Sequence, residues 1–248
     1  MNGAKKSITV VLVHAAWADA SSWNKVIPRL QKRGLQVVSA QIPLTSLLDD
    51  VDAVRRELAR LQDPVVLAGH SYGGAVVSAA AAGEEKVEAL AIIAGMAPEE
   101  GETVAALLHR DPPHPQIAQP VPDERGFLRL PEGAFANAVA PDSSAEECAL
   151  MQVVQRPLSV KCITEPMPKP GWKEKQSWFL IAERDRMISP VTQRFMAERM
   201  KARIDAQDVD HTPLSSAPEK VVRLIVEAVD SGVFDARLAA PLLIGSTA

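Results

Sequence analysis

Short apolar runs alternate along the chain with stretches whose apolar residues recur at helical spacing. Continuous runs of Val, Ile, Leu and Ala are typical of strands buried on both faces of a parallel sheet. Strands are predicted at 7–13, 35–41, 64–68, 87–94, 177–182 and 202–207.

Helices are predicted in the intervals between these strands. The clearest covers 45–61, where one side of the helix carries Leu47, Leu48, Val51, Val54, Leu58 and Leu61. Others are expected at 23–33, 75–82, 190–200 and 217–231. The alternation predicts right-handed βαβ units and therefore an α/β fold, with a mostly parallel sheet of about six strands flanked by helices.

The pattern changes between Met96 and Lys175, where prolines cluster and only short helical pieces are expected, near 103–109 and 144–154. A structureless loop of this length is implausible in a compact domain. We therefore expect 96–175 to form an inserted helical cap on a core made of 1–95 and 176–231. Residues 232–248 form a C-terminal tail, which could dock on the body, contribute to a homodimer or stay partly loose.

Composition narrows the class of protein. The 248 residues are 47% hydrophobic and 23% charged with a net charge of −4, which is ordinary for a globular protein. The chain has no basic stripe, so nucleic acid is not expected as a partner. No apolar run approaches the length of a membrane span, so no membrane partner is expected either. With only Cys148 and Cys162 and no secretory signal pattern, we expect free thiols and a cytoplasmic protein.

The motif Gly69-His70-Ser71-Tyr72-Gly73 lies between the strand at 64–68 and a helix of small residues. In a strand–turn–helix context, G-x-S-x-G predicts a nucleophile elbow. The flanking glycines allow strand and helix to approach closely, and Ser71 is expected in a strained backbone conformation. The helix N-terminus beside it favours a developing oxyanion.

A serine hydroxyl needs a general base, and the base needs an orienting carboxylate. His211 is the one histidine that follows the last predicted strand, and Asp185 follows the strand at 177–182. The order Ser71, Asp185, His211 is the order found in α/β-hydrolases.

Other carboxylates are alternatives for the acid. Glu183 is the second choice, because it lies close to Asp185, and Glu99 and Glu100 after the fourth strand come third. Asp208 and Asp210 flank the histidine and are predicted to be solvated turn residues.

The oxyanion hole is expected to use the backbone N–H of Tyr72 and one from the loop after the first strand, where Ala16 is the favoured donor. Trp17, Met96 and Met187 come from strand-end loops and are large and apolar. They predict a mostly apolar substrate pocket that favours uncharged esters with short acyl groups. The alternative is that these three side chains only pack under the cap.

These segments resemble the α/β-hydrolase superfamily, and within it small bacterial hydrolases related to plant methyl esterases and hydroxynitrile lyases. The resemblance covers 7–97 and 176–230 and is carried by Val11–Trp17, Ser22-Trp23, Pro43–Leu47, Gly69–Gly74, Glu183–Asp185 and Asp210–Ser215. It implies an enzyme that needs no cofactor and no metal. Two positions depart from the family pattern: Ala15 stands where glycine is usual, and Thr212 stands where the lyases have a lysine.

The sequence therefore predicts a serine esterase that cleaves small carboxylic esters through Ser71, His211 and Asp185. Hydrolysis of another acyl bond or of a C–C bond by the same residues is one alternative. A non-catalytic ligand-binding protein on this fold is the other.

Overall fold

A six-stranded sheet forms the centre of the molecule in the computed structural model, which describes residues 8–117 and 119–238. Every pairing in it is parallel, in the order β2-β1-β3-β4-β7-β8. The strands are β1 (Thr9–Val13), β2 (Gln36–Ala40), β3 (Val65–His70), β4 (Val87–Ile93), β7 (Gln176–Ala182) and β8 (Arg203–Gln207). The predicted parallel α/β sheet is confirmed.

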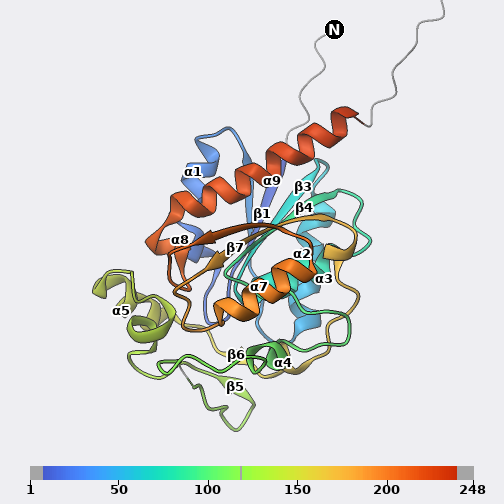
Figure 1. The fold of residues 1–248 in the computed structure, drawn as a ribbon. Helices are drawn as coiled ribbons and strands as arrows, with labels where there is room; N and C mark the ends of the chain where they lie inside the picture. The colour runs from blue at the N-terminus through green and yellow to red at the C-terminus, as the bar shows by residue number, and fades with distance from the viewer. Residues whose placement is uncertain (1–7, 118, 239–248) are drawn as a thin grey trace, which may run out of the picture.

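Helices cover both faces of the sheet (Figure 1). One face packs against α1 (Ile27–Gln31) and α9 (Pro218–Leu238), and the other against α2 (Leu47–Arg60), α3 (Tyr72–Ala80) and α7 (Pro190–Arg199). Successive residues of a strand serve opposite faces, so that in β1 Val11 belongs to one apolar cluster and Leu12 to the other. Burial on both faces explains why the central strands are mostly apolar.

Two predicted helices differ most from the structure in their bounds. The helix expected at 23–33 is a 3₁₀ turn, η1 (Ala20–Trp23), followed by the short α1, which begins just before Pro28 because proline fits only the first turn of a helix. The last helix continues past its predicted end at residue 231, to Leu238. What remains of the predicted tail, 239–248, lies outside the described residues.

Most of the segment between β4 and β7, which we call the cap, gathers at one end of the sheet (Figure 1). The part that leads into β7 runs back beside the C-terminal end of α3. The cap contains α4 (Val104–Leu108), β5 (Phe127–Leu128), η2 (Phe135–Val139), α5 (Ala145–Val154), β6 (Leu158–Ser159), α6 (Lys161–Thr164) and η3 (Gly171–Lys173). The antiparallel pair of β5 and β6 was not predicted, because strands of two residues show no alternation. Helix α5 begins with a capping box formed by Ser144 and Glu147.

Across residues 8–117 and 119–238, no helix has the length and apolarity needed to span a bilayer. Cys148 and Cys162 are both buried and both free, as the sequence predicts.

Candidate active site

Ser71 occupies the sharp turn between β3 and α3. Its backbone angles, φ 54° and ψ −124°, lie in a region that residues with a side chain rarely adopt. A Cβ atom on Gly69 would lie 2.4 Å from the carbonyl oxygen of Gly73, and one on Gly73 would lie 2.6 Å from that of His14. The motif needs glycine at both positions because the backbones on either side touch.

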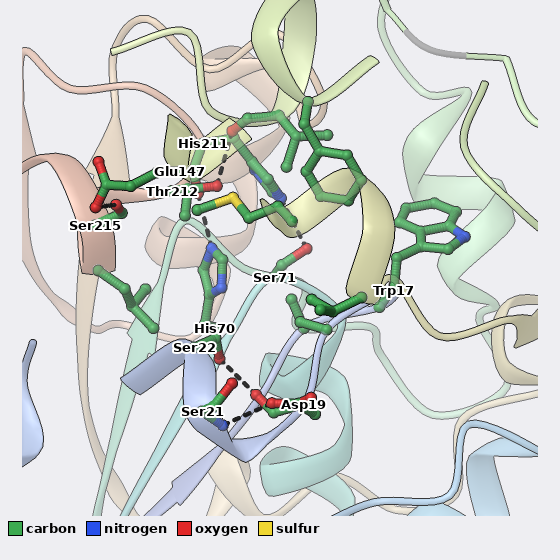
Figure 2. Close-up of a pocket in the computed structure, with 18 of the residues that line it drawn as sticks. Trp17, Asp19, Ser21, Ser22, His70, Ser71, Glu147, His211, Thr212 and Ser215 are labelled. Carbon is green, nitrogen blue, oxygen red and sulfur yellow. Dashed lines mark hydrogen bonds between the residues drawn. The ribbon is translucent and has the colours of Figure 1, made fainter. Parts of the chain in front are cut away.

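His211, from the loop after β8, lies between the other two predicted residues. Its Nε2 atom is 2.9 Å from Oγ of Ser71 (Figure 2). Its Nδ1 atom is 2.7 Å from Oδ2 of Asp185. Because an ionised carboxylate only accepts hydrogen bonds, Nδ1 carries the proton and Nε2 is free to accept from the serine hydroxyl. This is the arrangement that a general base for Ser71 requires.

The Asp185 carboxylate is buried and held by three further donors. Its Oδ1 accepts from the N–H groups of Met187 and Ile188, at 2.7 and 2.9 Å. Its Oδ2 also accepts from Nε2 of Gln193, at 2.7 Å. Gln193 is fully buried on α7, and sequence reasoning missed it because an isolated glutamine on a helix usually faces water.

The alternative acids point elsewhere. Glu183 is exposed and forms an ion pair of 2.6 Å with Arg194. Glu99 forms an ion pair with Lys173, and Glu100 is exposed. In the part of the chain that the structure describes, none of these carboxylates is hydrogen-bonded to His211.

Of the two aspartates that flank the histidine, only one is a solvated turn residue. Asp208 is exposed as predicted. For Asp210 the prediction is wrong: it is fully buried and accepts from the N–H groups of Thr212 and Asp142 and from the hydroxyl of Ser216. The pKa of this carboxyl group is raised, because the effect of burial outweighs that of the three donors, which lower it. Asp210 therefore joins the histidine loop to the cap.

The loop after β1 lies against the elbow. His14 is buried, donates from Nδ1 to the carbonyl of Ala15 at 2.9 Å, and accepts at Nε2 from the N–H of Ile42 at 3.2 Å. Burial lowers the pKa of His14 to about 4, so its imidazole is neutral. Ala16 lines the cavity beside Ser71, and Tyr72 begins α3 with its backbone N–H in the first turn.

A cavity of about 260 Å³ opens at Ser71 and His211. Its walls are mostly apolar and come from the core and the cap together: Ala15, Ala16, Trp17, Leu130, Phe135, Val139, Leu150, Met151, Val154 and Met187. Trp17 has φ 59° and donates from its indole to the carbonyl of Leu128 at 3.1 Å. Met96 is absent from this lining, because it is buried in the apolar core.

A second wall of the cavity is polar, which the sequence did not predict. It is formed by Asp19, Ser21, Ser22, Glu147, Thr212 and Ser215 (Figure 2), together with Asn24 and Lys25. Lys25 forms an ion pair with Glu147 of α5 and donates to the carbonyl of Ser215 at 3.1 Å. The cap and the segment after β1 therefore meet at this wall. Over the described residues, no three His, Cys, Asp or Glu side chains group as a metal site requires.

Comparison with known proteins decides the family. Residues 10–224 match the model of the alpha/beta hydrolase family. The chain belongs to this family. Norfluorocurarine synthase 1 of Strychnos nux-vomica is 26% identical over 267 residues, covering 93% of this chain and 98% of the relative.

Solved structures show the same fold. Polyneuridine aldehyde esterase, as a mutant, superposes with a TM-score of 0.77 at 17% identity, covering 89% of this chain and 98% of the other. A pyrethroid hydrolase from Sphingobium faniae does so with 0.76 at 21% identity, covering 91% and 98%. The predicted α/β-hydrolase fold and the predicted superfamily are confirmed.

In this alpha/beta hydrolase the cap is hydrogen-bonded to the loop that carries Asp185 and to the loop that carries His211. Arg184, next to Asp185, holds the carboxylate of Asp142 with two bonds of 2.8 and 2.6 Å. The Arg186 side chain donates to the carbonyl of residue 137 at 2.7 Å, and the Thr212 hydroxyl to that of residue 139 at 2.8 Å. Residues 137–142 are therefore a shared support for the loops that carry Asp185 and His211.

Proposed function

We propose that this hydrolase is a serine carboxylesterase that acts on small carboxylic esters. The observation that supports this most strongly is the hydrogen-bonded series Ser71–His211–Asp185 at the cavity. A buried carboxylate that orients the imidazole, and an imidazole that accepts from a serine on a strained turn, are the parts that acyl transfer needs.

In the proposed mechanism Ser71 Oγ attacks the ester carbonyl while Nε2 of His211 takes its proton. The tetrahedral oxyanion accepts hydrogen bonds from the backbone N–H groups of Tyr72 and Ala16. His211 then protonates the departing alcohol, and Asp185 stabilises the imidazolium in between. Water, deprotonated by His211, attacks the acyl-enzyme and releases the carboxylic acid and Ser71.

The mostly apolar cavity favours uncharged esters with short acyl groups, with Trp17 and Met187 among the residues that contact substrate. The names of two structural neighbours, an esterase and a pyrethroid hydrolase, support an ester substrate. A lyase that expels cyanide gains from a cation beside the histidine, and the neutral Thr212 occupies that position. Hydrolysis of another acyl bond or of a C–C bond by the same three residues is the second candidate.

The test combines labelling with turnover. A serine-directed organophosphate should label the protein stoichiometrically, and Ser71→Ala should abolish both labelling and hydrolysis of p-nitrophenyl esters of graded acyl length. Circular dichroism and the thermal midpoint of Ser71→Ala serve as the folding control. A folded Ser71→Ala protein with unchanged kcat would contradict the proposal, and a wild-type protein that is never labelled would favour a non-catalytic ligand binder.

A further inference from the structure

The side chain of Tyr72 lies outside the lining of the cavity, although its backbone N–H is a proposed oxyanion donor. Its hydroxyl donates to Oδ2 of Asp50 at 2.7 Å, and Tyr72 and Asp50 are 2% and 0% exposed. The other carboxylate oxygen, Oδ1, accepts from the N–H of Leu44 at 2.6 Å. Asp50 therefore joins the residue after the nucleophile to the loop that follows β2.

A carboxylate at position 50 lowers the stability of the fold, because it is fully buried. Burial raises the pKa of the Asp50 carboxyl group to about 6, although hydrogen bonds from Tyr72 and Leu44 oppose the shift. It is not needed to begin α2, because Ser46 caps that helix by accepting from the N–H of Asp49. A buried carboxylate is tolerated when its donors satisfy it, so the presence of Asp50 is explained by the groups it holds.

The same loop is also bonded to the segment that contains the other proposed donor, Ala16. We call residues 42–44 the bridging loop. The Arg156 side chain, from the cap, donates to the carbonyls of Ile42 and Pro43 at 2.8 and 3.2 Å. The backbone N–H of Arg156 donates to the carbonyl of Trp17 at 3.1 Å, and His14 accepts from the N–H of Ile42. The loop that contains Ala16 is thus held to the bridging loop from two sides.

We propose that Asp50 and Arg156 are positioning residues that set the spacing between the two oxyanion donors through the bridging loop. Neither touches the substrate. The inference rests on the proposed esterase function. Its physical reason is that oxyanion donors act only at about 2.7–3.1 Å from the developing charge, so small displacements of either N–H weaken stabilisation of the transition state.

The experiment removes each side-chain contact while keeping both backbone N–H groups in the chain. Tyr72→Phe deletes only the hydroxyl that reaches Asp50, and Arg156→Gln deletes the guanidinium. Each should lower kcat for p-nitrophenyl esters roughly 10- to 100-fold, with a smaller change in KM. The loss is smaller than for complete removal of an oxyanion donor, because these variants only displace one. Binding of a trifluoromethyl ketone, which forms a tetrahedral adduct with the serine, should weaken by the same factor.

Matched controls separate positioning from general loss of stability. Ser78→Ala removes another buried hydroxyl of α3, which donates to the carbonyl of Gly74, and Arg129→Gln removes an exposed cap arginine. Both should keep wild-type kcat and inhibitor affinity. Asp50→Asn, which can still bond to Tyr72 and Leu44, should retain most of the activity that Asp50→Leu loses.

A spectroscopic measurement gives a readout that stability alone does not move. The ester carbonyl stretch of the acyl-enzyme should shift to higher frequency in Tyr72→Phe, because a poorly placed donor polarises it less. If Tyr72→Phe does not fold, Arg156→Gln at a half-buried position decides. If the folded variants keep the wild-type kcat, inhibitor affinity and carbonyl frequency, the inference is overturned and the proposed function stands. An unlabelled Ser71 in the wild-type protein would overturn the proposed function and the inference together.

Discussion

The Nε2 atom of His70 lies 2.7 Å from the backbone carbonyl oxygen of His211, and the two imidazole rings are 5.2 Å apart. A carbonyl only accepts, so Nε2 of His70 donates. Burial lowers the pKa of His70 to about 3, so the ring is neutral. The residue before the proposed nucleophile thus holds the loop that carries the proposed base.

His70→Phe should therefore lower kcat and destabilise the protein. Phenylalanine fills the ring volume but leaves the buried carbonyl of His211 without its donor, at a cost of about 1–3 kcal/mol in the free energy of unfolding. Urea denaturation and ester hydrolysis measure the two effects. His70→Gln, which can still donate, should lose less of each. A His70→Phe protein with wild-type stability and kcat would show that this hydrogen bond has no such role.

Asp185→Asn should lower kcat by several orders of magnitude, because an amide cannot orient and stabilise the imidazolium as a carboxylate does. Glu183→Gln, on the exposed ion pair with Arg194, is the control and should leave kcat unchanged. Gln193→Met should fall between them, since it removes one of the two donors at Oδ2. If Glu183→Gln were the damaging change, the assignment of the acid would be wrong.

Stability should fall as the pH drops from about 6.5 toward 4. The pKa of His14 is lowered from its ordinary 6.5 to about 4, so between these values the unfolded chain binds a proton that the folded one excludes. The free energy of unfolding is therefore unaffected by His14 above pH 6.5 and falls on acidification. At about 1.4 kcal/mol per pKa unit, His14 accounts for a loss on the order of 3 kcal/mol once the pH has dropped below about 4.

Other buried groups modify this slope. His70 acts in the same direction as His14, because its pKa is lowered to about 3. Asp50 acts in the opposite direction, because its pKa is raised to about 6 and protonation favours the folded state. Thermal midpoints from pH 7.5 to 4 should fall steeply in the wild type and less in His14→Gln. A His109→Gln variant, at an exposed position, is the control and should keep the wild-type pH dependence. An equal fall of the thermal midpoint with pH in the wild type and in His14→Gln would contradict the lowered pKa of His14.

Trp17→Ala and Met187→Ala should shift preference toward bulkier acyl or alcohol groups, because both side chains line the cavity. A difference of one methylene group is worth roughly 1–3 kcal/mol in kcat/KM discrimination. Ratios of kcat/KM across a p-nitrophenyl ester series measure the shift. Met96→Leu, in the core and outside the lining, should not change these ratios. Unchanged preference in both cavity variants would mean that specificity is set by other walls.

The parts of the fold that the sequence predicted are those with a strong local signal. The central strands β1, β3, β4 and β7 are mostly apolar runs, the α2 region has clear helical spacing, and the elbow has glycines that its backbone contacts require. The proposed acid and base follow strands, so their place along the chain was enough to select Asp185 and His211. The helix at 23–33 was predicted too long because Pro28 and the preceding 3₁₀ turn gave no clear boundary.

What the sequence did not predict depends on contacts between distant segments. Asp50 is buried because Tyr72 and Leu44 supply donors, and Asp210 because the cap supplies one through Asp142. Each of these aspartates, met in isolation, is expected on the surface. The polar wall of the cavity has the same origin, since Lys25 meets Glu147 only when the cap has folded over the core.

The bonds that join cap residues 137–142 to Arg184, Arg186 and Thr212 limit how the chain can be re-engineered. A chimera that received a foreign cap would need a carboxylate facing Arg184 and free carbonyls facing the other two side chains. Without them the graft would disturb catalysis even where it supplied a well-shaped cavity. Substitutions confined to α5, by contrast, leave those bonds intact, so libraries for new substrates belong on that helix.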